Sequence, residues 1–178
     1  MEQINNNLFG ILTQFTGRSS VFDAVIAFGA DIFPYVILII LLVLIFREKN
    51  LKRRVLLMIQ AVLTVLLSWG VMAQTFHTLF PFSRPFVYFN LEPLVYAVGP
   101  AFPSGHATFF FALAAMIFTF NRKWGALLLV VAFLNGICRV AARVHWPLDV
   151  MGGAFFGILS AIFVFILLTP LFLKTEKE

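Results

Sequence analysis

The sequence predicts an all-α fold, a bundle of five to six transmembrane helices in a single domain. Of its 178 residues, 61% are hydrophobic and only 12% are charged, which lies outside the range of water-soluble globular domains. Five apolar stretches approach the length of about 20 residues that a helix needs to cross a bilayer. Because a backbone that faces lipid must pair its own polar groups, we expect these stretches to be helical. They run over residues 31–46, 55–76, 108–120, 124–142 and 148–173, with the third extended at its start from Ser104.

The segment before the first span has a different character. Arg18 and Asp23 interrupt its apolar pattern before a full crossing accumulates. We predict a pair of interfacial helices over residues 1–30, with a sixth, poorly formed span as the alternative. The first residues also lack the basic start and cleavage site of a secretory signal. The membrane domain is expected over 31–173, followed by a short cytoplasmic tail over 174–178.

The basic residues indicate how the chain is oriented. Lys and Arg cluster in three segments, which are 47–54, 121–123 and 174–178. Because such clusters mark the cytoplasmic side, the segments 77–103 and 143–147 are predicted to face outward. They hold or border all three histidines. We therefore predict a multi-pass plasma-membrane protein with an extracytoplasmic site, and the formal charge of +5 indicates topology, not a nucleic-acid partner.

Two arginines and a helix start are predicted to bind phosphate. Arg84 and Arg139 supply planar, charged forks that match phosphate oxygens. The sequence Pro-Ser-Gly-His at 103–106 opens a helix, so Ser104 can cap it while free N–H groups near Gly105 point at an anion. Each of these segments lies at the end of a predicted span on the same side of the membrane, so we expect them at the same depth in the bilayer. The sequence thus predicts a phosphate cradle at the outer surface.

A histidine and an aspartate beside this cradle favour nucleophilic chemistry. His145 and Asp149 are four residues apart at the start of the last helix, so the carboxylate can reach the imidazole. A carboxylate on one ring nitrogen leaves the other free as a nucleophile. His106, next to the cradle, is placed to give a proton to the departing oxygen.

These same residues resemble the three-part signature of the type-2 phosphatidic acid phosphatase superfamily, which includes membrane lipid phosphatases and soluble vanadium haloperoxidases. The resemblance covers about residues 30–170, and the matching positions are Arg84, Pro85, Pro103, Ser104, Gly105, His106, Arg139, His145 and Asp149. The resemblance implies that His145 forms a phosphohistidine, that Asp149 orients it, and that His106 protonates the leaving group and later activates water. It implies that Arg84, Arg139, Ser104 and Gly105 hold the phosphoryl oxygens, and it implies no metal and no other cofactor.

The sequence departs from the family pattern at three positions. His77 stands where the family usually has a Lys, with six residues between it and Arg84. Cys138 replaces the small Ser that usually precedes Arg139 and is expected to pack in its place. Arg143 adds a cation near the nucleophile. We predict that His77 contributes a pH-dependent charge to the cradle, and that Arg143 either compensates for the missing Lys or reaches the second phosphate of a diphosphate.

The expected substrate is a lipid whose phosphate sits at the interface while its tail stays among membrane lipids. The resemblance favours a polyprenyl diphosphate, notably undecaprenyl diphosphate, and thus the bacterial diphosphatases associated with bacitracin resistance and cell-wall synthesis. Phosphatidylglycerol phosphate or phosphatidic acid is the alternative. A non-catalytic lipid-phosphate binder or transporter, and a phosphotransferase that shares the first half-reaction, also remain open.

Overall fold

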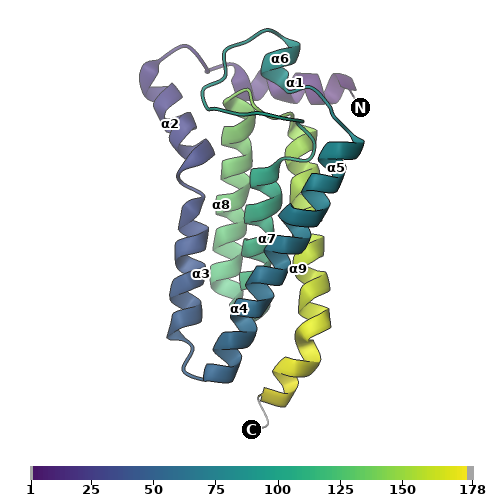
Figure 1. The fold of residues 1–178 in the computed structure, drawn as a ribbon. Helices are drawn as coiled ribbons and strands as arrows, with labels where there is room; N and C mark the ends of the chain where they lie inside the picture. The colour runs from purple at the N-terminus through teal and green to yellow at the C-terminus, as the bar shows by residue number, and fades with distance from the viewer. Residues whose placement is uncertain (1, 176–178) are drawn as a thin grey trace.

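A computed structural model gives the fold, and it describes residues 2–175 with the side chains of residues 3–173. All the regular elements in this part of the chain are helical (Figure 1). They are α1 (Glu2–Thr13), α2 (Ser20–Asp31), α3 (Tyr35–Arg47), α4 (Leu51–Val65), the π-helix η1 (Leu66–Ala73), α5 (Gln74–Leu79), α6 (Pro85–Tyr88), α7 (Gly105–Phe120), α8 (Arg122–Ala141) and α9 (Pro147–Thr175). The prediction of an all-α bundle is confirmed. The tail predicted over 174–178 lies outside the described residues, apart from the helical backbone at 174 and 175.

Each of the five predicted spans corresponds to an apolar helix or to a continuous run of helices, which we call a rod. Three are long and apolar enough to cross a membrane by themselves, namely Leu51–Leu79, Arg122–Ala141 and Pro147–Leu173. The first of these joins α4, η1 and α5 into one rod. Helices α2 and α3 together pass as a fourth span that is bent by 41°. Helix α7 has 16 residues and is shorter than the other rods.

The part of the chain that precedes the first predicted span is also helical. A helix, α2, occupies residues 20–31 and continues into α3 through the bend at 32–34. Helix α1 lies across the end of the bundle, beside α6 and the loops on either side of it, residues 80–84 and 89–104 (Figure 1). We call these the outer loops, after the orientation that the sequence predicts. Residues 2–31 therefore form two helices with different relations to the bundle. One lies over its end, and the other extends its first span.

Helix α7 is the centre of the bundle and packs against α8, α9 and α4. Its short length fits this position, since most of its side chains contact protein. The buried set is Ala107, Thr108, Phe110, Phe111, Ala112, Leu113, Ala114, Ala115, Met116 and Ile117. Helix α9 approaches closely, because a Cβ added at Gly157 would lie 2.5 Å from the carbonyl oxygen of Thr108. Small residues thus hold the start of α7, where the site lies, against α9.

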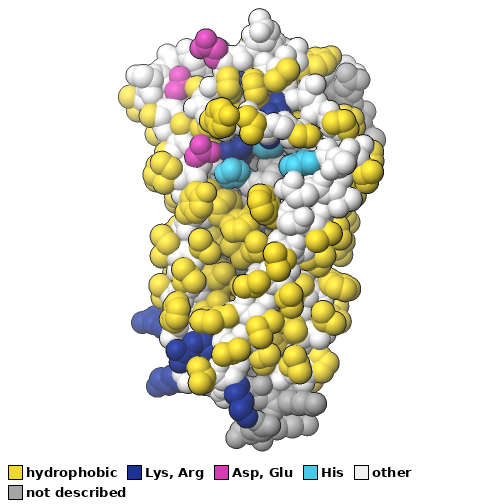
Figure 2. All heavy atoms as spheres, viewed as in Figure 1, with side chains coloured by type: hydrophobic (Ala, Val, Ile, Leu, Met, Phe, Trp, Pro, Cys, Tyr) yellow, Lys and Arg dark blue, Asp and Glu magenta, His cyan; other side chains and the backbone are white. Residues whose placement is uncertain are grey.

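The two ends of the bundle differ in their side chains. Figure 2 shows Lys and Arg side chains gathered at the lower end, where the sequence REKNLKRR connects α3 to α4. Histidine side chains lie near the opposite end, just below the outer loops, and a broad hydrophobic band covers the face between the two levels. The histidines thus lie at the end away from the α3–α4 connection.

Candidate active site

His145 lies in the loop between α8 and α9 and is almost completely buried, at 1% exposure. Its Nδ1–H donates a hydrogen bond to the carbonyl oxygen of Ala101 at 3.0 Å. Because a carbonyl can only accept, this contact assigns the proton of the neutral ring to Nδ1. Nε2 therefore keeps its lone pair and accepts a hydrogen bond from Nη1 of Arg84 at 3.2 Å. The imidazole is oriented as a nucleophile through Nε2.

Asp149 stands in the first turn of α9, close to the other edge of the same ring. Its Oδ2 accepts a hydrogen bond from the backbone N–H of Trp146 at 2.7 Å and lies 3.5 Å from Nδ1 of His145. The carboxylate is thus within ion-pair distance, but the shorter contact of Nδ1 is with Ala101. Sequence reasoning missed Ala101, because a backbone carbonyl leaves no signal in a motif.

Arg84 connects the outer loop to His145. Each of its five N–H groups donates a hydrogen bond, one of them to His145. The other four acceptors are backbone carbonyls, those of Val98, Gly99, Pro100 and Val144. A phosphoryl oxygen at this guanidinium must therefore replace one of the acceptors. The contact with Nε2 is the one that opens when that nitrogen forms a bond to phosphorus.

The start of α7 has the predicted cap. Oγ of Ser104 accepts from the N–H of Ala107 at 3.4 Å, and the N–H of Ser104 donates to the carbonyl of Asp149 at 2.9 Å. A Cβ at Gly105 would lie 3.3 Å from Nε1 of Trp69, so the glycine lets the indole of η1 approach this helix start closely. The remaining N–H groups of the first turn are a suitable anion site.

Arg139 brings a second guanidinium to the site, together with a carboxylate that the sequence did not assign to it. Nη1 of Arg139 lies 2.6 Å from Oδ1 of Asp31, and the same oxygen lies 3.9 Å from Nε2 of His106. Asp31 is the last residue of α2 and lies outside the three sequence motifs. The Nε–H of Arg139 is buried and has no hydrogen-bond partner among the described residues. An unpaired buried donor of this kind is well suited to a phosphoryl oxygen.

His77 lies beside the helix start, as its place in the sequence predicts. Its Nε2–H donates to the carbonyl oxygen of Pro103 at 2.9 Å, which links α5 to the residue just before Ser104. The structure thus brings His77 to the same loop that begins α7. A protonated imidazole here adds a positive charge near the cradle.

Arg143 makes its hydrogen bonds to another part of the molecule. Its guanidinium donates to the carbonyl oxygens of Thr16 at 2.9 Å and Glu92 at 3.2 Å. These contacts connect the loop of the nucleophile to the turn after α1 and to the outer loop. Cys138 packs against α2, where a Cβ at Gly29 would lie 2.6 Å from its Sγ. Both residues therefore have clear packing roles.

The protonation of the site follows from burial and from its positive neighbours. Burial lowers the pKa of His145 well below its usual value, and the charges of Arg139 and Arg84 and the nearby His106 lower it further. The neutral imidazole is thus the resting form. Burial also lowers the pKa of the Arg84 guanidinium, while the carboxylate of Asp149 opposes this effect. Within the described residues, no group of three His, Cys, Asp or Glu side chains is placed to hold a metal ion.

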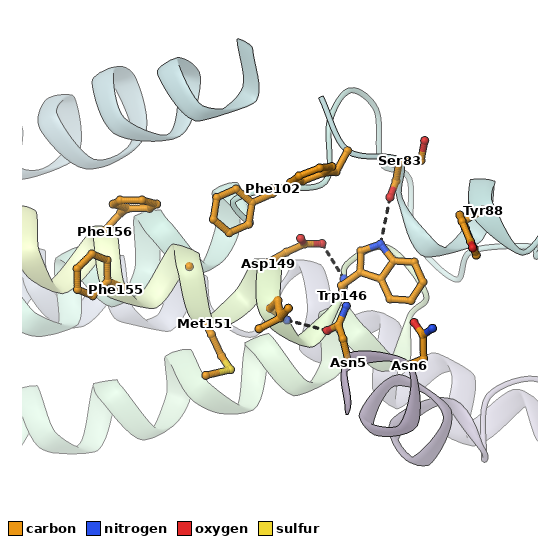
Figure 3. A pocket seen from close by; sticks show the side chains of 13 residues that line it. Asn5, Asn6, Ser83, Tyr88, Phe102, Trp146, Asp149, Met151, Phe155 and Phe156 are labelled. Atoms are coloured by element: carbon orange, nitrogen blue, oxygen red, sulfur yellow. Dashed lines mark hydrogen bonds between the residues drawn. The ribbon is translucent and has the colours of Figure 1, made fainter. Parts of the chain in front are cut away.

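Two apolar spaces lie near these residues. The larger, of about 890 Å³, borders α1, α9 and the outer loop, and of the predicted site residues Asp149 alone lines it. Figure 3 shows Asp149 and Trp146 together at this cavity, among Phe102, Phe155 and Phe156. His145 itself is not among the residues that line this cavity.

The second space is an apolar groove of about 350 Å³ between α3, α4 and η1. Phe109 and Leu113 of α7 also line it. These two residues follow His106 by three and seven positions, so all three share one face of α7. The groove therefore runs away from His106 along the helix that carries it.

Comparisons with known proteins agree with this geometry. A sequence profile described as the PAP2 superfamily matches residues 79–172. The chain is 33% identical to the "Bacitracin transport permease protein BcrC" of Bacillus licheniformis, over 92% of this chain and 80% of the relative. It is 31% identical to the "Putative undecaprenyl-diphosphatase YbjG" of Escherichia coli (strain K12), over 91% of this chain and 81% of the relative.

A solved structure has the same fold. The crystal structure of LpxE from Aquifex aeolicus superimposes with a TM-score of 0.71 and 28% sequence identity, over 90% of this chain and 94% of LpxE. The profile match includes all the predicted site residues except His77. This chain therefore belongs to the PAP2 superfamily and is a multi-pass membrane phosphatase of that family.

Proposed function

We propose that this enzyme hydrolyses undecaprenyl diphosphate to undecaprenyl phosphate and inorganic phosphate on the extracytoplasmic side of the plasma membrane. The observation that carries the proposal is the orientation of His145. Its Nδ1–H is fixed on Ala101, and its Nε2 lone pair is held against Arg84. An imidazole that is buried, neutral and oriented through one nitrogen is suited to in-line attack on phosphorus.

The reaction has two steps. Nε2 of His145 attacks the terminal phosphorus, so that an N–P bond forms and the bond from phosphorus to the bridging oxygen breaks. The departing lipid phosphate takes a proton from His106. Arg84, released from Nε2, then donates to a phosphoryl oxygen, and Arg139 and the first turn of α7 bind the others. In the second step water attacks phosphorus and gives a proton to His106, while the N–P bond breaks and its electron pair returns to Nε2 of His145. Inorganic phosphate leaves, and both histidines regain their starting forms.

Two features support a long-chain lipid as the substrate. The apolar groove beside α7 offers space for a hydrocarbon chain whose phosphate is at His106. The E. coli relative, at 31% identity, is described as a putative undecaprenyl-diphosphatase. Phosphatidylglycerol phosphate and phosphatidic acid also have apolar chains, so they are the competing substrates.

The test is a substrate panel on purified protein in detergent. Undecaprenyl diphosphate, phosphatidylglycerol phosphate and phosphatidic acid are compared at equal mole fraction, with and without chelator, and with His145→Ala as the control. We expect the highest kcat/KM on the diphosphate, unchanged by chelator, and no phosphate release by His145→Ala. A higher kcat/KM on a glycerolipid would refute the proposed substrate. Absence of release from every lipid would favour a binder or transporter, and phosphate found on an added alcohol would indicate a phosphotransferase.

The sidedness has a separate test, because the chain has a single cysteine, Cys138. In a Cys138→Ser background, Asn90→Cys marks the outer loop after α6, and Asn50→Cys marks the connection between α3 and α4. We expect a membrane-impermeant thiol reagent to label Asn90→Cys in intact cells and Asn50→Cys only after lysis. The reverse pattern would place the site in the cytoplasm.

A further inference from the structure

Asp31 lies between the second arginine of the site and its predicted proton donor. Its Oδ1 is 2.6 Å from Nη1 of Arg139 and 3.9 Å from Nε2 of His106. We propose that Asp31 is a positioning residue for the reaction, which fixes the guanidinium of Arg139 and holds the proton on His106. The inference rests on the proposed phosphatase chemistry and adds a residue from outside the three sequence motifs.

The position of Asp31 is fixed by the way α2 ends on α8. Asn135, which is fully buried, donates from Nδ2 to the carbonyl oxygens of Gly29 at 2.9 Å and Ala30 at 2.7 Å. The last carbonyls of a helix otherwise lack partners, so these bonds secure the end of α2. Asn135 and Arg139 are four residues apart and thus share a face of α8. On that face, Asn135 binds the last backbone carbonyls of α2, and Arg139 binds the carboxylate of Asp31.

The charges around His106 explain why a carboxylate is needed. Burial of His106, and after it the charges of Arg139 on α8 and Arg84 in the outer loop, disfavour a positive charge on the imidazole, although a proton donor must carry one. His145 is neutral, and Asp149 hydrogen bonds to Trp146 near the other edge of the His145 ring. Tyr35 on α3 and His77 on α5 supply no negative charge at neutral pH. Among the described residues, Asp31 is the carboxylate within ion-pair distance of His106.

The geometry also defines how the carboxylate acts. At 3.9 Å the contact with His106 is longer than a hydrogen bond, so Asp31 acts through charge. Its side chain is 42% exposed, and solvent weakens the effect without removing it. The contact with Arg139 is short and holds a guanidinium whose own side chain is 4% exposed. The carboxylate of Asp31 therefore positions Arg139 and His106, and both of these side chains are proposed to contact the same phosphoryl group.

The first experiment compares Asp31→Asn with the matched control Asp23→Asn, which removes a charge from the same helix at a position bonded to Gly17. The rate of phosphoenzyme formation is measured in single turnovers with undecaprenyl diphosphate between pH 5.5 and 9. For Asp31→Asn we expect the alkaline limb to move down by about 0.5 to 1 pH unit, so that the rate is three- to tenfold lower along that limb and nearly normal on its acid side. A purely structural role would lower the rate equally at every pH, and that result would overturn the proposal.

A second measurement is independent of catalysis. Histidine-labelled protein is titrated by NMR, and the three histidines are assigned with single His→Gln variants. We expect the titration midpoint of His106 to fall in Asp31→Asn by about the same 0.5 to 1 unit and to stay unchanged in Asp23→Asn. An unmoved midpoint overturns the role of Asp31 even if the enzyme is an active phosphatase. If the midpoint shifts but the protein releases no phosphate from any lipid, the proposed function is overturned, whereas the interaction between Asp31 and His106 is supported.

Discussion

Nη1 of Arg84 donates hydrogen bonds both to Nε2 of His145 at 3.2 Å and to the carbonyl of Val144 at 2.9 Å. One guanidinium group thus holds the nucleophilic nitrogen and the backbone next to it. Its other three N–H groups donate to the carbonyls of residues 98–100. Arg84 therefore lies at the candidate site and also connects the outer loop to the loop that carries His145.

This dual position predicts the effect of Arg84→Lys. A lysine keeps the charge but cannot donate five hydrogen bonds in a fixed plane. We expect kcat/KM to fall by about 100-fold or more and the free energy of unfolding to fall by about 2–4 kcal/mol. Both are measured on purified protein, by phosphate release and by thermal unfolding. Arg18→Lys, which lies on the turn before α2, serves as the control, and equal effects of the two substitutions would contradict the role of Arg84.

The burial of His145 predicts how stability depends on pH. Its pKa in the folded protein is lowered, whereas in the unfolded chain it is close to 6.5. The unfolded state therefore takes up a proton below about pH 6.5 that the native state resists. The stabilising contribution is complete above that pH and is lost as the pH falls, by up to about 1.4 kcal/mol per pH unit.

The measurement for this effect is thermal unfolding of the wild type and of His145→Gln between pH 5 and 8. We expect the wild type to lose more stability on acidification than the variant, because the variant cannot bind this proton. Parallel curves would show that His145 is not held neutral. The same burial predicts that phosphoenzyme formation has no acid limb near pH 6.5 from the nucleophile.

Arg143 gives a prediction that separates packing from substrate binding. Its hydrogen bonds to Thr16 and Glu92 join the loop of the nucleophile to the N-terminal turn. We expect Arg143→Ala to lower the unfolding temperature while the ratio of rates on lipid monophosphate and lipid diphosphate stays the same. A selective loss of diphosphate activity would instead support contact of Arg143 with the second phosphate.

The helical bundle could be predicted from the sequence because the length of each apolar stretch can be read without knowing any distant contact. The same is true of the basic clusters, which predict the orientation. Sequence reasoning also predicted that the segments with His77, Arg84, Ser104 and His145 meet, because the ends of neighbouring spans must lie at one depth. These segments do meet, as the contacts of Arg84 with Val144 and of Ser104 with Asp149 demonstrate.

The features that sequence reasoning missed depend on distant contacts. Asp31 resembles any polar residue at a helix end, and its role emerges only when Asn135 fixes α2 against α8. The Ala101 carbonyl that orients His145 belongs to a residue with no polar side chain. Helix α2 is short and apolar and ends at the bend before α3. The hydrophobic pattern of such a helix is the same whether it crosses the membrane or lies at its surface, so the sequence left both possibilities open.

The contact between α7 and α9 predicts a strong effect of a single methyl group. A Cβ at Gly157 would lie 2.5 Å from the carbonyl oxygen of Thr108 and 2.9 Å from the backbone nitrogen of Ala112. Both atoms belong to the backbone of α7, so they cannot move aside easily. We expect Gly157→Ala to destabilise the protein by about 1–3 kcal/mol. Gly10→Ala is the control, because a Cβ at this position has no atom within 4 Å and alanine favours a helix. If the Gly157→Ala protein were as stable as this control, the close packing of α7 against α9 would be disproved.

His77 is the position where this enzyme departs most clearly from the family pattern, and His77→Lys tests what the change does. The imidazole donates to the carbonyl of Pro103, and a lysine ammonium can donate to the same oxygen. The two differ in charge, because the lysine ammonium is a compact, strongly hydrated point charge. We expect His77→Lys to lower KM for the diphosphate by about three- to tenfold at pH 8.

His77→Gln separates this charge from the hydrogen bond. Its amide N–H can still donate to Pro103 but carries no charge at any pH. If the wild-type imidazole contributes a pH-dependent charge, KM of His77→Gln rises above that of the wild type as the pH falls. If KM of all three proteins follows the same curve with pH, His77 contributes only its bond to the loop before α7, and the phosphate cradle depends on Arg84, Arg139 and the helix start alone.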